Sequence, residues 1–247
     1  MKVLVIPDIH LKPYIFDAAE KILKDGKADQ AVCLMDIADD WNKEYDISLY
    51  ASTYDRANDF AKMFPTTLWC YGNHDISYVW NKLETGYSPY AEKTVCTKIK
   101  EIEKQVGKNI AFIHKVDKVI FCHGGLSSYF VSTLHDRLPD LHIDSIIATT
   151  NSLSKKELWM DHSPLWLRPQ YGEVAMFHSD EFKQVIGHTP VEKIYEKNGV
   201  ISTDVFSTYR DGTQIGESAM IVIETTTGEY EKIPVSKEEV NGNGKTI

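Results

Sequence analysis

Residues 2–10 have the sequence KVLVIPDIH, in which an apolar run leads directly into an Asp and a His. The run predicts a strand over 2–7 that is buried on both faces, because its residues are nearly all apolar rather than alternating with polar ones. QAVCLM (30–35) and TTLWCY (66–71) repeat the pattern, and each is followed by polar residues that can bind metal. The sequence therefore predicts three buried strands with such residues at their ends.

Segments with helical spacing of apolar residues separate these strands, at 14–25 and at about 47–63. Strand–helix repetition is typical of a parallel sheet covered by helices, which predicts an α/β fold. A further helix is expected over 89–107, with a glycine as its C-terminal cap. More strands follow in the second half, and the NG dipeptide at 198–199 predicts a hairpin turn.

The chain has 247 residues, with 27 Lys and Arg against 36 Asp and Glu, so its net charge is −9. This length fits one domain, expected over 1–235, followed by a polar tail at 236–247. The acidic balance argues against an extended nucleic-acid-binding surface, which would show clustered Lys and Arg. No apolar run is long enough to span a membrane and the N-terminus lacks a signal-peptide layout, so we expect a cytoplasmic protein.

The four cysteines are Cys33, Cys70, Cys96 and Cys122, and they form no CxxC pair. Three of them lie in apolar, strand-like runs, where a free cysteine acts as a small buried hydrophobe. Reduced core thiols are therefore favoured over disulfides or metal ligands, as in cytosolic enzymes.

Five short motifs follow apolar runs, and each carries residues that can bind a metal. They are PDIH (7–10), MDIAD (35–39), YGNHD (71–75), CHGG (122–125) and IGHTP (186–190). In open α/β sheets ligands bind beyond the carboxyl ends of the strands, so the motifs are expected to surround one crevice. Each motif alone has an ordinary alternative as a turn or a strand-end cap. The five together predict a metal-binding site.

The order D-x-H, D-x-x-D, G-N-H-D, H-G-G, G-H resembles the calcineurin-like metallophosphoesterases, and the resemblance covers nearly the whole chain. It implies their α/β fold, with β-sheets sandwiched between helices and the metal site at the carboxyl ends of the strands. It also implies six metal ligands: Asp8, His10, Asp36, Asn73, His123 and His188. Asp8, His10 and Asp36 would hold the first metal. Asp36 would bridge to the second metal, which the other three ligands complete.

Carboxylate and imidazole ligands suit two divalent transition-metal ions, with Mn expected and Fe or Zn as alternatives. Phosphoester hydrolysis needs a nucleophile at neutral pH and relief of charge on the phosphoryl group, and two ions about 3.5–4 Å apart supply both. The ions would also attract an anion into an acidic protein. The expected partner is a phosphorylated substrate, which would be a phosphoprotein, a nucleotide or a small phosphoester.

His74, next to Asn73, resembles the family's general acid, and Asp39 resembles the carboxylate that orients it. An Asp–His pair favours the protonated imidazole that a proton donor requires. The alternative makes Asp39 and Asp75 solvated turn residues. Arg168 is the candidate phosphate clamp, because a guanidinium binds phosphate oxygens bidentately. Its alternative is an arginine on a surface loop.

The motif HGGLS (123–127) resembles the serine/threonine phosphoprotein phosphatases and the bacterial diadenosine polyphosphate hydrolases. Pro190 stands where nuclease-like and purple-phosphatase-like members often carry the second His of G-H-x-H. Phosphoprotein phosphatases follow D-x-x-D with Arg-Gly, whereas this chain has Asp40 and Trp41, so one phosphate-binding arginine is absent. Trp41 would either face a nucleobase or tyrosyl substrate or pack in the core.

Three glycines of the family pattern are replaced. Met35 precedes Asp36 where the family has Gly-Asp, and Pro7 and Leu11 replace the two glycines of G-D-x-H-G. Glycine before Asp36 is expected to ease close packing rather than to supply chemistry. None of these changes removes a ligand.

Three functions compete. The leading prediction is a metal-dependent phosphomonoesterase of the phosphoprotein phosphatase-like branch. The alternative is a nucleotide phosphodiesterase or dinucleoside polyphosphate hydrolase on the same two-metal core. The third is a non-enzymatic scaffold, which the retention of all six ligands and His74 argues against.

Overall fold

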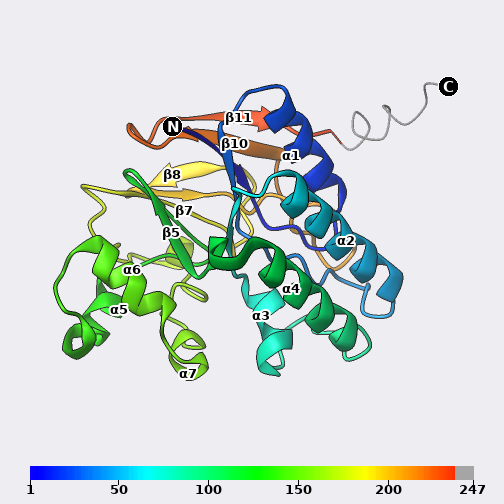
Figure 1. The fold of residues 1–247 in the computed structure, drawn as a ribbon, viewed down its shortest axis with the longest axis horizontal. Helices are drawn as coiled ribbons and strands as arrows, with labels where there is room; N and C mark the ends of the chain where they lie inside the picture. Colours follow the sequence, from blue (N-terminus) through cyan, green and yellow to red (C-terminus); the bar gives the residue numbers. More distant parts are fainter. Residues whose placement is uncertain (237–247) are drawn as a thin grey trace.

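The computed structural model describes residues 1–236, which form two β-sheets flanked by helices (Figure 1). The first sheet has the strand order β11 (Tyr230–Pro234), β10 (Ala219–Glu224), β1 (Lys2–Ile6), β2 (Gln30–Cys33), β3 (Leu68–Cys70) and β4 (Ile110–Ala111). Strands β1 to β4 run parallel, as the buried apolar runs predict. Strand β10 pairs antiparallel with both β1 and β11, so the hairpin of β10 and β11 extends the sheet beyond β1. The sequence pattern does not reveal this pairing.

The second sheet has the order β5 (Ile113–Val116), β6 (Val119–Cys122), β7 (Lys183–Ile186), β9 (Val200–Ser202) and β8 (Tyr195–Lys197). Its three inner strands, β6, β7 and β9, are parallel, while β5 and β8 are antiparallel edges. Asn198 and Gly199 both have positive φ and form the turn between β8 and β9, as the NG dipeptide predicts.

The helices fall on two sides of the sheets (Figure 1). The first group is α1 (Tyr14–Lys24), α2 (Ile47–Met63), α3 (Asn73–Trp80) and α4 (Glu92–Val106). The second group is α5 (Ser128–Thr133), α6 (Ile143–Asn151) and α7 (Lys155–Leu158). Short 3₁₀ turns are η1 (Gly107–Asn109), η2 (His135–Arg137) and η3 (Pro169–Tyr171). The predicted helices at 14–25, 47–63 and 89–107 are present, whereas α3 was not predicted.

Alternate residues of the second sheet belong to two different cores. Val119 and Phe121 of β6 pack with the strands of the first sheet, whereas Ile120 and Cys122 pack with α5 to α7. A strand presents successive side chains to opposite faces, so this sheet has the first sheet on one face and helices on the other. The sheets are therefore sandwiched between helices, as expected of the fold class.

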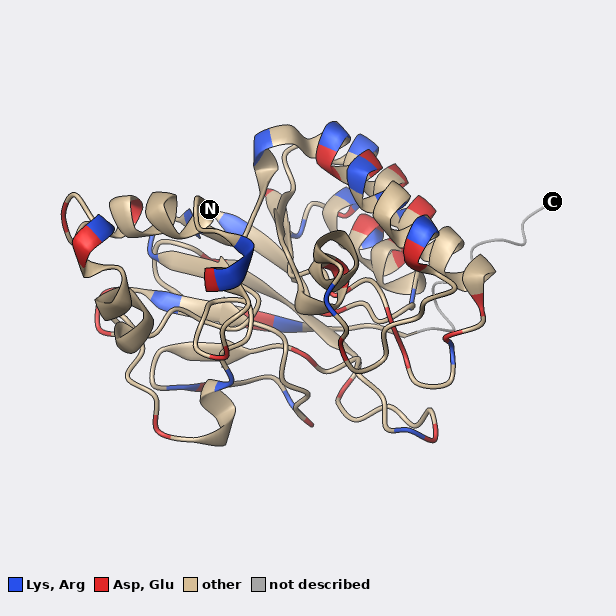
Figure 2. Ribbon diagram, turned by 90° about the horizontal axis from the view of Figure 1, so that it is seen from below, with Lys and Arg blue, Asp and Glu red and all other residues tan. Residues whose placement is uncertain are grey.

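Charged residues of both signs alternate along the exposed helix faces (Figure 2). Arg56 of α2 pairs with Asp17 and Glu20 of α1, and Lys98 of α4 pairs with Asp55 of α2. Among residues 1–236, none of the helices combines the length and the apolar character that crossing a membrane requires.

The four cysteines lie within the described part of the chain, and all are free thiols. Cys33, Cys70 and Cys122 are buried in the strands, as expected for core residues, and Cys96 is partly buried in α4. The predicted polar tail at 236–247 lies outside the described residues, apart from Ser236.

Candidate metal centre

Most of the predicted ligands directly follow the carboxyl ends of parallel strands. Asp8, Asp36 and Asn73 follow β1, β2 and β3 of the first sheet, and His123 and His188 follow β6 and β7 of the second. The carboxyl ends of parallel strands meet at one edge of a sheet, which is where α/β proteins bind ligands. The two sheets together bring these side chains into one crevice.

The first cluster of potential metal ligands contains Asp36, His123 and His188, whose ligand atoms all lie within 4.8 Å of one another. The Nε2 atom of His123 lies 3.1 Å from Oδ2 of Asp36 and 2.9 Å from Oδ1 of Asn73. Asn73 therefore belongs to this cluster. It matches the set that the resemblance implies for the second metal.

The second cluster contains Asp8, His10 and Asp204, again with ligand atoms within 4.8 Å of one another. Asp8 and His10 were predicted as ligands of the first metal, whereas Asp204 was not predicted. Asp204 follows β9, so it arises in the same way as the other ligands, at the carboxyl end of a parallel strand. The short strand that includes Val200 and Ile201, just before it, is the signal that would have pointed to it.

The histidine rings are oriented as in metal sites. Nδ1 of His123 lies 3.1 Å from the carbonyl oxygen of Leu34, and Nδ1 of His10 lies 2.9 Å from that of Asp39. In His188 the other ring nitrogen plays this part, because Nε2 lies 3.1 Å from the carbonyl oxygen of Trp166. A ring nitrogen that donates to a carbonyl leaves the other nitrogen with a lone pair, which is the arrangement of metal-binding histidines.

The backbone at the site is held in an uncommon conformation. His10, Asp36, Asp39 and His188 have φ values of 42°, 41°, 63° and 64°, in the left-handed region that non-glycine residues rarely adopt. Such conformations cost of order 1–3 kcal/mol each and cluster at functional sites. Met35 and Leu11 also have positive φ, 58° and 57°. The family's glycines at these positions thus relieve backbone strain, and the expectation of a packing role alone was incomplete.

The donor set fits divalent cations. Asp8, Asp36 and Asp204 are each at most 1% exposed, and Oδ1 of Asp8 has no hydrogen-bond partner within residues 1–236. Burial raises the pKa of the Asp8 carboxyl well above its usual range, and the charges of Asp204 and Asp36 raise it further. Burial lowers the pKa of His188 well below its ordinary value, and His123 and Arg168 reinforce this shift. Buried carboxylates and a neutral imidazole are the expected surroundings of a bound cation.

His74 and Asp39 form a hydrogen-bonded pair beside the first cluster. Nδ1 of His74 lies 2.9 Å from Oδ2 of Asp39, and the backbone N–H of His74 donates to Oδ1 of Asp36. Burial lowers the pKa of His74, but the charge of Asp36 and the hydrogen bond to Asp39 outweigh it and raise the pKa to about 9. Asp39 and Asp75 are 2% and 0% exposed, so the alternative of solvated turn residues is wrong for both.

Asp75 is a residue whose role the sequence did not reveal. Its carboxylate accepts hydrogen bonds from the backbone N–H groups of Ile37 and Ala38 and from the hydroxyl of Tyr54. It thereby fixes the loop that follows Asp36. No feature of the sequence distinguishes an aspartate that holds this loop from an ordinary aspartate in a turn.

An open cleft with a volume of about 280 Å³ lies over the two clusters. Its lining includes three predicted ligands, His10, Asp36 and His188, together with Asp204. It also includes Asp39, Asp40, Trp41, His74, Glu84, Thr85, Gly86, Arg168, Pro190, Ser207 and Thr208. The predicted acid and the predicted clamp thus face the same space as the clusters.

Arg168 is anchored at the cleft rather than free on a surface loop. Its Nη1 donates to the carbonyl oxygen of His188 at 2.8 Å and to Oγ1 of Thr189 at 3.2 Å. The Arg168 loop, which contains Pro164, Leu167 and Arg168 and precedes η3, lies close to Gly124. The backbone N–H of Gly124 donates to the carbonyl oxygen of Pro164. A methyl group on Gly124 would come 2.7 Å from the backbone N of Leu167, so glycine is required for this approach.

Asp40 is neutralised in the structure. Its Oδ2 pairs with Nζ of Lys12 at 2.8 Å, and its Oδ1 accepts a hydrogen bond from Thr208. Trp41 lines the cleft and is not part of the buried core, and the guanidinium of Arg210 lies 5.0 Å from its ring centroid. The carboxylate that replaces the family's arginine therefore does not face the cleft as an unpaired charge.

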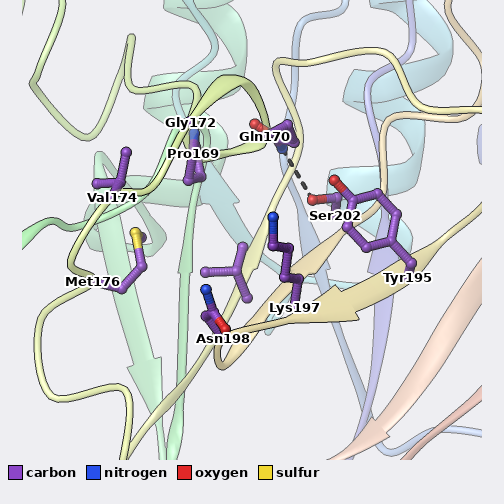
Figure 3. A pocket seen from close by; sticks show the side chains of 10 residues that line it. Pro169, Gln170, Gly172, Val174, Met176, Tyr195, Lys197, Asn198 and Ser202 are labelled. Atoms are coloured by element: carbon purple, nitrogen blue, oxygen red, sulfur yellow. Dashed lines mark hydrogen bonds between the residues drawn. The ribbon is translucent and has the colours of Figure 1, made fainter.

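A much smaller pocket lies beside the Arg168 loop, between η3 and the hairpin of β8 and β9 (Figure 3). Nε2 of Gln170 donates to Oγ of Ser202 across it at 3.0 Å, which ties η3 to β9. Its volume of about 20 Å³ has room for a single water molecule but not for a phosphoester. This pocket supports the loop and is not a substrate site.

Comparison with known proteins identifies the family of the chain. The calcineurin-like phosphoesterase family matches residues 1–207. A comparison with curated proteins gave no match. Solved structures with this fold include a cold-active protein-tyrosine phosphatase of the psychrophile Shewanella sp., 21% identical, matched over 94% of this chain and 80% of that chain with a TM-score of 0.56.

Two further structures are more distant. An archaeal phosphodiesterase is 16% identical, matched over 95% of this chain and 100% of its own, with a TM-score of 0.44. A metallophosphoesterase from Sphaerobacter thermophilus is 12% identical, matched over 98% and 92%, with a TM-score of 0.45. Likeness at such identities concerns the fold, whereas the family match spans most of the sequence. The chain therefore belongs to the calcineurin-like phosphoesterase family and is a phosphoric ester hydrolase.

Proposed function

We propose that the protein is a metal-dependent phosphomonoesterase with a dinuclear centre, and that residues 1–235 act as one domain. The proposed ligands are Asp8, His10, Asp36, Asn73, His123 and His188. The observation that carries this proposal is the shared cleft, in which His74 and Arg168 face the same space as three of these ligands. We further propose Mn²⁺ as the native metal, with Fe or Zn as alternatives, and a cytoplasmic location.

When bound, two divalent cations supply a nucleophile from water at neutral pH and offset the charge of the phosphoryl group. Asp36 is the proposed bridging ligand. Its carboxylate is held by the backbone N–H of His74 at 2.9 Å, and a methyl group on Gly72 would overlap it. This close support fixes the carboxylate within the cluster that it forms with His123 and His188.

His74 is the proposed general acid. A leaving alkoxide needs a proton, and the raised pKa of His74 keeps its imidazole protonated at neutral pH. Nδ1 is occupied by Asp39, so Nε2 is the atom that would donate the proton to the leaving oxygen. Asp39 is the proposed positioning residue that holds the ring.

Arg168 is the proposed phosphate clamp. Among the described residues its hydrogen bonds use Nη1 alone, so its Nε and Nη2 groups are available to phosphate oxygens. A guanidinium offers donors in a planar fork that matches two oxygens of a phosphate. Its anchoring on His188 and Thr189 places this fork beside the proposed metals.

The proposal is tested with p-nitrophenyl phosphate in the presence of Mn²⁺. The purified protein should hydrolyse it, and Asp36→Asn should abolish the activity. Gly172→Ala serves as a matched control, because a methyl group there meets no atom within 4 Å. Metal-loaded protein that is inert towards a broad panel of phosphomonoesters would reject the proposal.

The alternative is a nucleotide phosphodiesterase or dinucleoside polyphosphate hydrolase. The position of Trp41 in the cleft lining favours it, since an aromatic face can stack on a nucleobase. The similar fold of a protein-tyrosine phosphatase supports the proposal that the protein hydrolyses phosphomonoesters. Comparing kcat/KM for bis-nucleotides and phosphopeptides separates the two, and a phosphopeptide preference of tenfold or more would reject the nucleotide reading.

A further inference from the structure

Asp204 occupies a position that the six-ligand set does not explain. It is a carboxylate only 1% exposed, and one of its oxygens lies within 4.8 Å of one ligand atom each of Asp8 and His10. A turn aspartate normally keeps its charge in water, because burying a charge without a partner is costly. Something at this place must therefore offset the charge.

The protein itself supplies little compensation. The hydrogen-bond donors of Asp204 are the backbone N–H of Ser207 at 3.3 Å and the hydroxyl of Ser207 at 2.9 Å. Within residues 1–236 no Lys or Arg forms an ion pair with Asp204 or Asp8, although Lys12 does so with the neighbouring Asp40. Two buried carboxylates thus lie side by side, with His10 as their shared imidazole neighbour.

A second observation points to a bound cation. Oδ1 of Asp8 is buried and has no hydrogen-bond partner in the described part of the chain, while Oδ2 accepts the backbone N–H of His188. An unsatisfied buried carboxylate oxygen costs free energy unless a cation binds it. Asp8 belongs to the same cluster as Asp204.

We propose that Asp204 is a seventh ligand of the dinuclear centre, binding the cation held by Asp8 and His10. The inference rests on the proposed dinuclear centre and goes beyond its six-ligand set. Pro190 stands where the G-H-x-H pattern has its additional histidine, so this chain lacks that ligand. Asp204, at the end of a different strand, supplies a carboxylate instead. Ser207 is the positioning residue, because its two hydrogen bonds hold the carboxylate.

This ligand makes the two metal positions chemically different. The cluster of Asp8, His10 and Asp204 has two carboxylates and one imidazole, whereas the cluster of Asp36, His123 and His188 has one carboxylate and two imidazoles. Carboxylates suit Mn²⁺ and Mg²⁺, and imidazoles suit Zn²⁺ and Fe²⁺. The metal position that includes Asp204 therefore has the harder ligands, in the hard–soft sense, and should favour Mn²⁺.

The test measures metal binding without substrate. Metal-free protein is titrated with Mn²⁺, free Mn²⁺ is followed by its electron paramagnetic resonance signal, and bound metal is counted by elemental analysis. Asp204→Asn keeps the shape of the side chain and removes its charge. Asp211→Asn is the matched control, since Asp211 lies in the same connection between β9 and β10 but is exposed.

We expect the wild-type protein to bind two Mn²⁺ ions. In Asp204→Asn, the affinity for Mn²⁺ should fall by about tenfold or more at one of the two positions and stay unchanged at the other. Asp211→Asn should bind as the wild type does. Equal binding of both ions by Asp204→Asn would overturn the inference and leave the proposed function intact. A wild type that binds no pair of divalent ions would overturn both.

A second variant guards against misfolding of the first. Ser207→Ala removes one hydrogen bond to Oδ2 of Asp204 and keeps the carboxylate. We expect it to weaken the same position, by less than Asp204→Asn does. If Asp204→Asn does not fold, an unchanged Mn²⁺ isotherm in folded Ser207→Ala overturns the inference.

Discussion

Nδ1 of His74 lies 2.9 Å from Oδ2 of Asp39, although the two residues are 35 positions apart in the sequence. The other oxygen of Asp39 accepts the hydroxyls of Tyr50 at 2.8 Å and Tyr78 at 2.5 Å. The carboxylate is therefore held from three sides and cannot turn away from the imidazole. This arrangement fixes the direction in which His74 presents Nε2.

Replacing Asp39 with Asn should lower kcat by about 100-fold, because general acid catalysis contributes about 10²–10⁴-fold. The alkaline limb of the pH–rate profile should also move to lower pH, since the pKa of His74 falls when the carboxylate is lost. Steady-state kinetics between pH 6 and 10 checks both effects. Tyr50→Phe keeps the contact between Asp39 and His74 and should cost less than tenfold. A profile that stays in place in Asp39→Asn contradicts the role of Asp39.

The free energy of unfolding of the metal-free protein should depend on pH through the protonation of His74. Its pKa in the folded protein, about 9, exceeds its ordinary value of 6.5, so protonation stabilises the folded state. This stabilisation is fully present below pH 6.5 and is lost as the pH rises through 9. The loss amounts to at most about 3.5 kcal/mol, at about 1.4 kcal/mol per pKa unit.

Urea denaturation in EDTA, at pH 6.5 and at pH 9.5, measures this loss. The difference in the free energy of unfolding between the two pH values should be smaller in His74→Gln than in the wild type. His135→Gln is the control, because His135 is exposed. Equal pH dependence in the wild type and in His74→Gln would refute the prediction.

Gly187→Ala should impair metal binding. A methyl group at Gly187 would overlap the Asp8 carboxylate, which must then move from its place. We expect Mn²⁺ affinity to fall by about tenfold or more, in the range found when the support of a metal ligand is lost. Gly172→Ala should leave binding unchanged, because open space surrounds that position. Mn²⁺ titration of both variants decides the point.

Removing the metal should lower the thermal stability. Without a cation, the buried carboxylates of Asp8, Asp36 and Asp204 repel one another. Restoring Mn²⁺ at about 100 times its dissociation constant should stabilise by about 2.7 kcal/mol per site, or raise Tm by about 5–10 °C for a chain of this size. Thermal unfolding with EDTA and with Mn²⁺ measures this shift. Asp36→Asn should reduce it, and an unchanged Tm would argue against a metal site.

Arg168→Lys should lower kcat/KM for a phosphomonoester by about 10–100-fold, mainly through KM. The lysine keeps the charge but loses the planar fork that binds two phosphate oxygens. Thr189→Val tests whether Arg168 acts only as a support, because it removes one of the oxygens that anchor Nη1. We expect a smaller effect from Thr189→Val. An Arg168→Lys enzyme with wild-type kcat/KM would exclude the clamp.

Local sequence pattern accounts for most of the elements. The apolar runs at 2–7, 30–35 and 66–71 contain β1, β2 and β3, and helical spacing at 47–63 coincides with α2. Helix α3 was missed because it begins inside a motif whose polar residues hide its periodicity. The antiparallel pairing of β10 with β1 was not predicted, because pairing partners distant in the sequence leave no local pattern.

The sequence by itself determined the family, the strand-end motifs and the identity of the residues proposed as ligands. It could do so because a ligand's chemistry and its place after an apolar run are local properties. Only the tertiary structure decided that Asp204 joins Asp8 and His10, that Lys12 neutralises Asp40, and that Asp39 holds His74 from a buried position. Asp204 follows a strand of the second sheet and reaches Asp8 and His10 because the two sheets pack against each other. The other two pairs join loops that follow neighbouring strands of the first sheet, so the order of strands in the sheet, rather than spacing along the chain, brings them within contact distance.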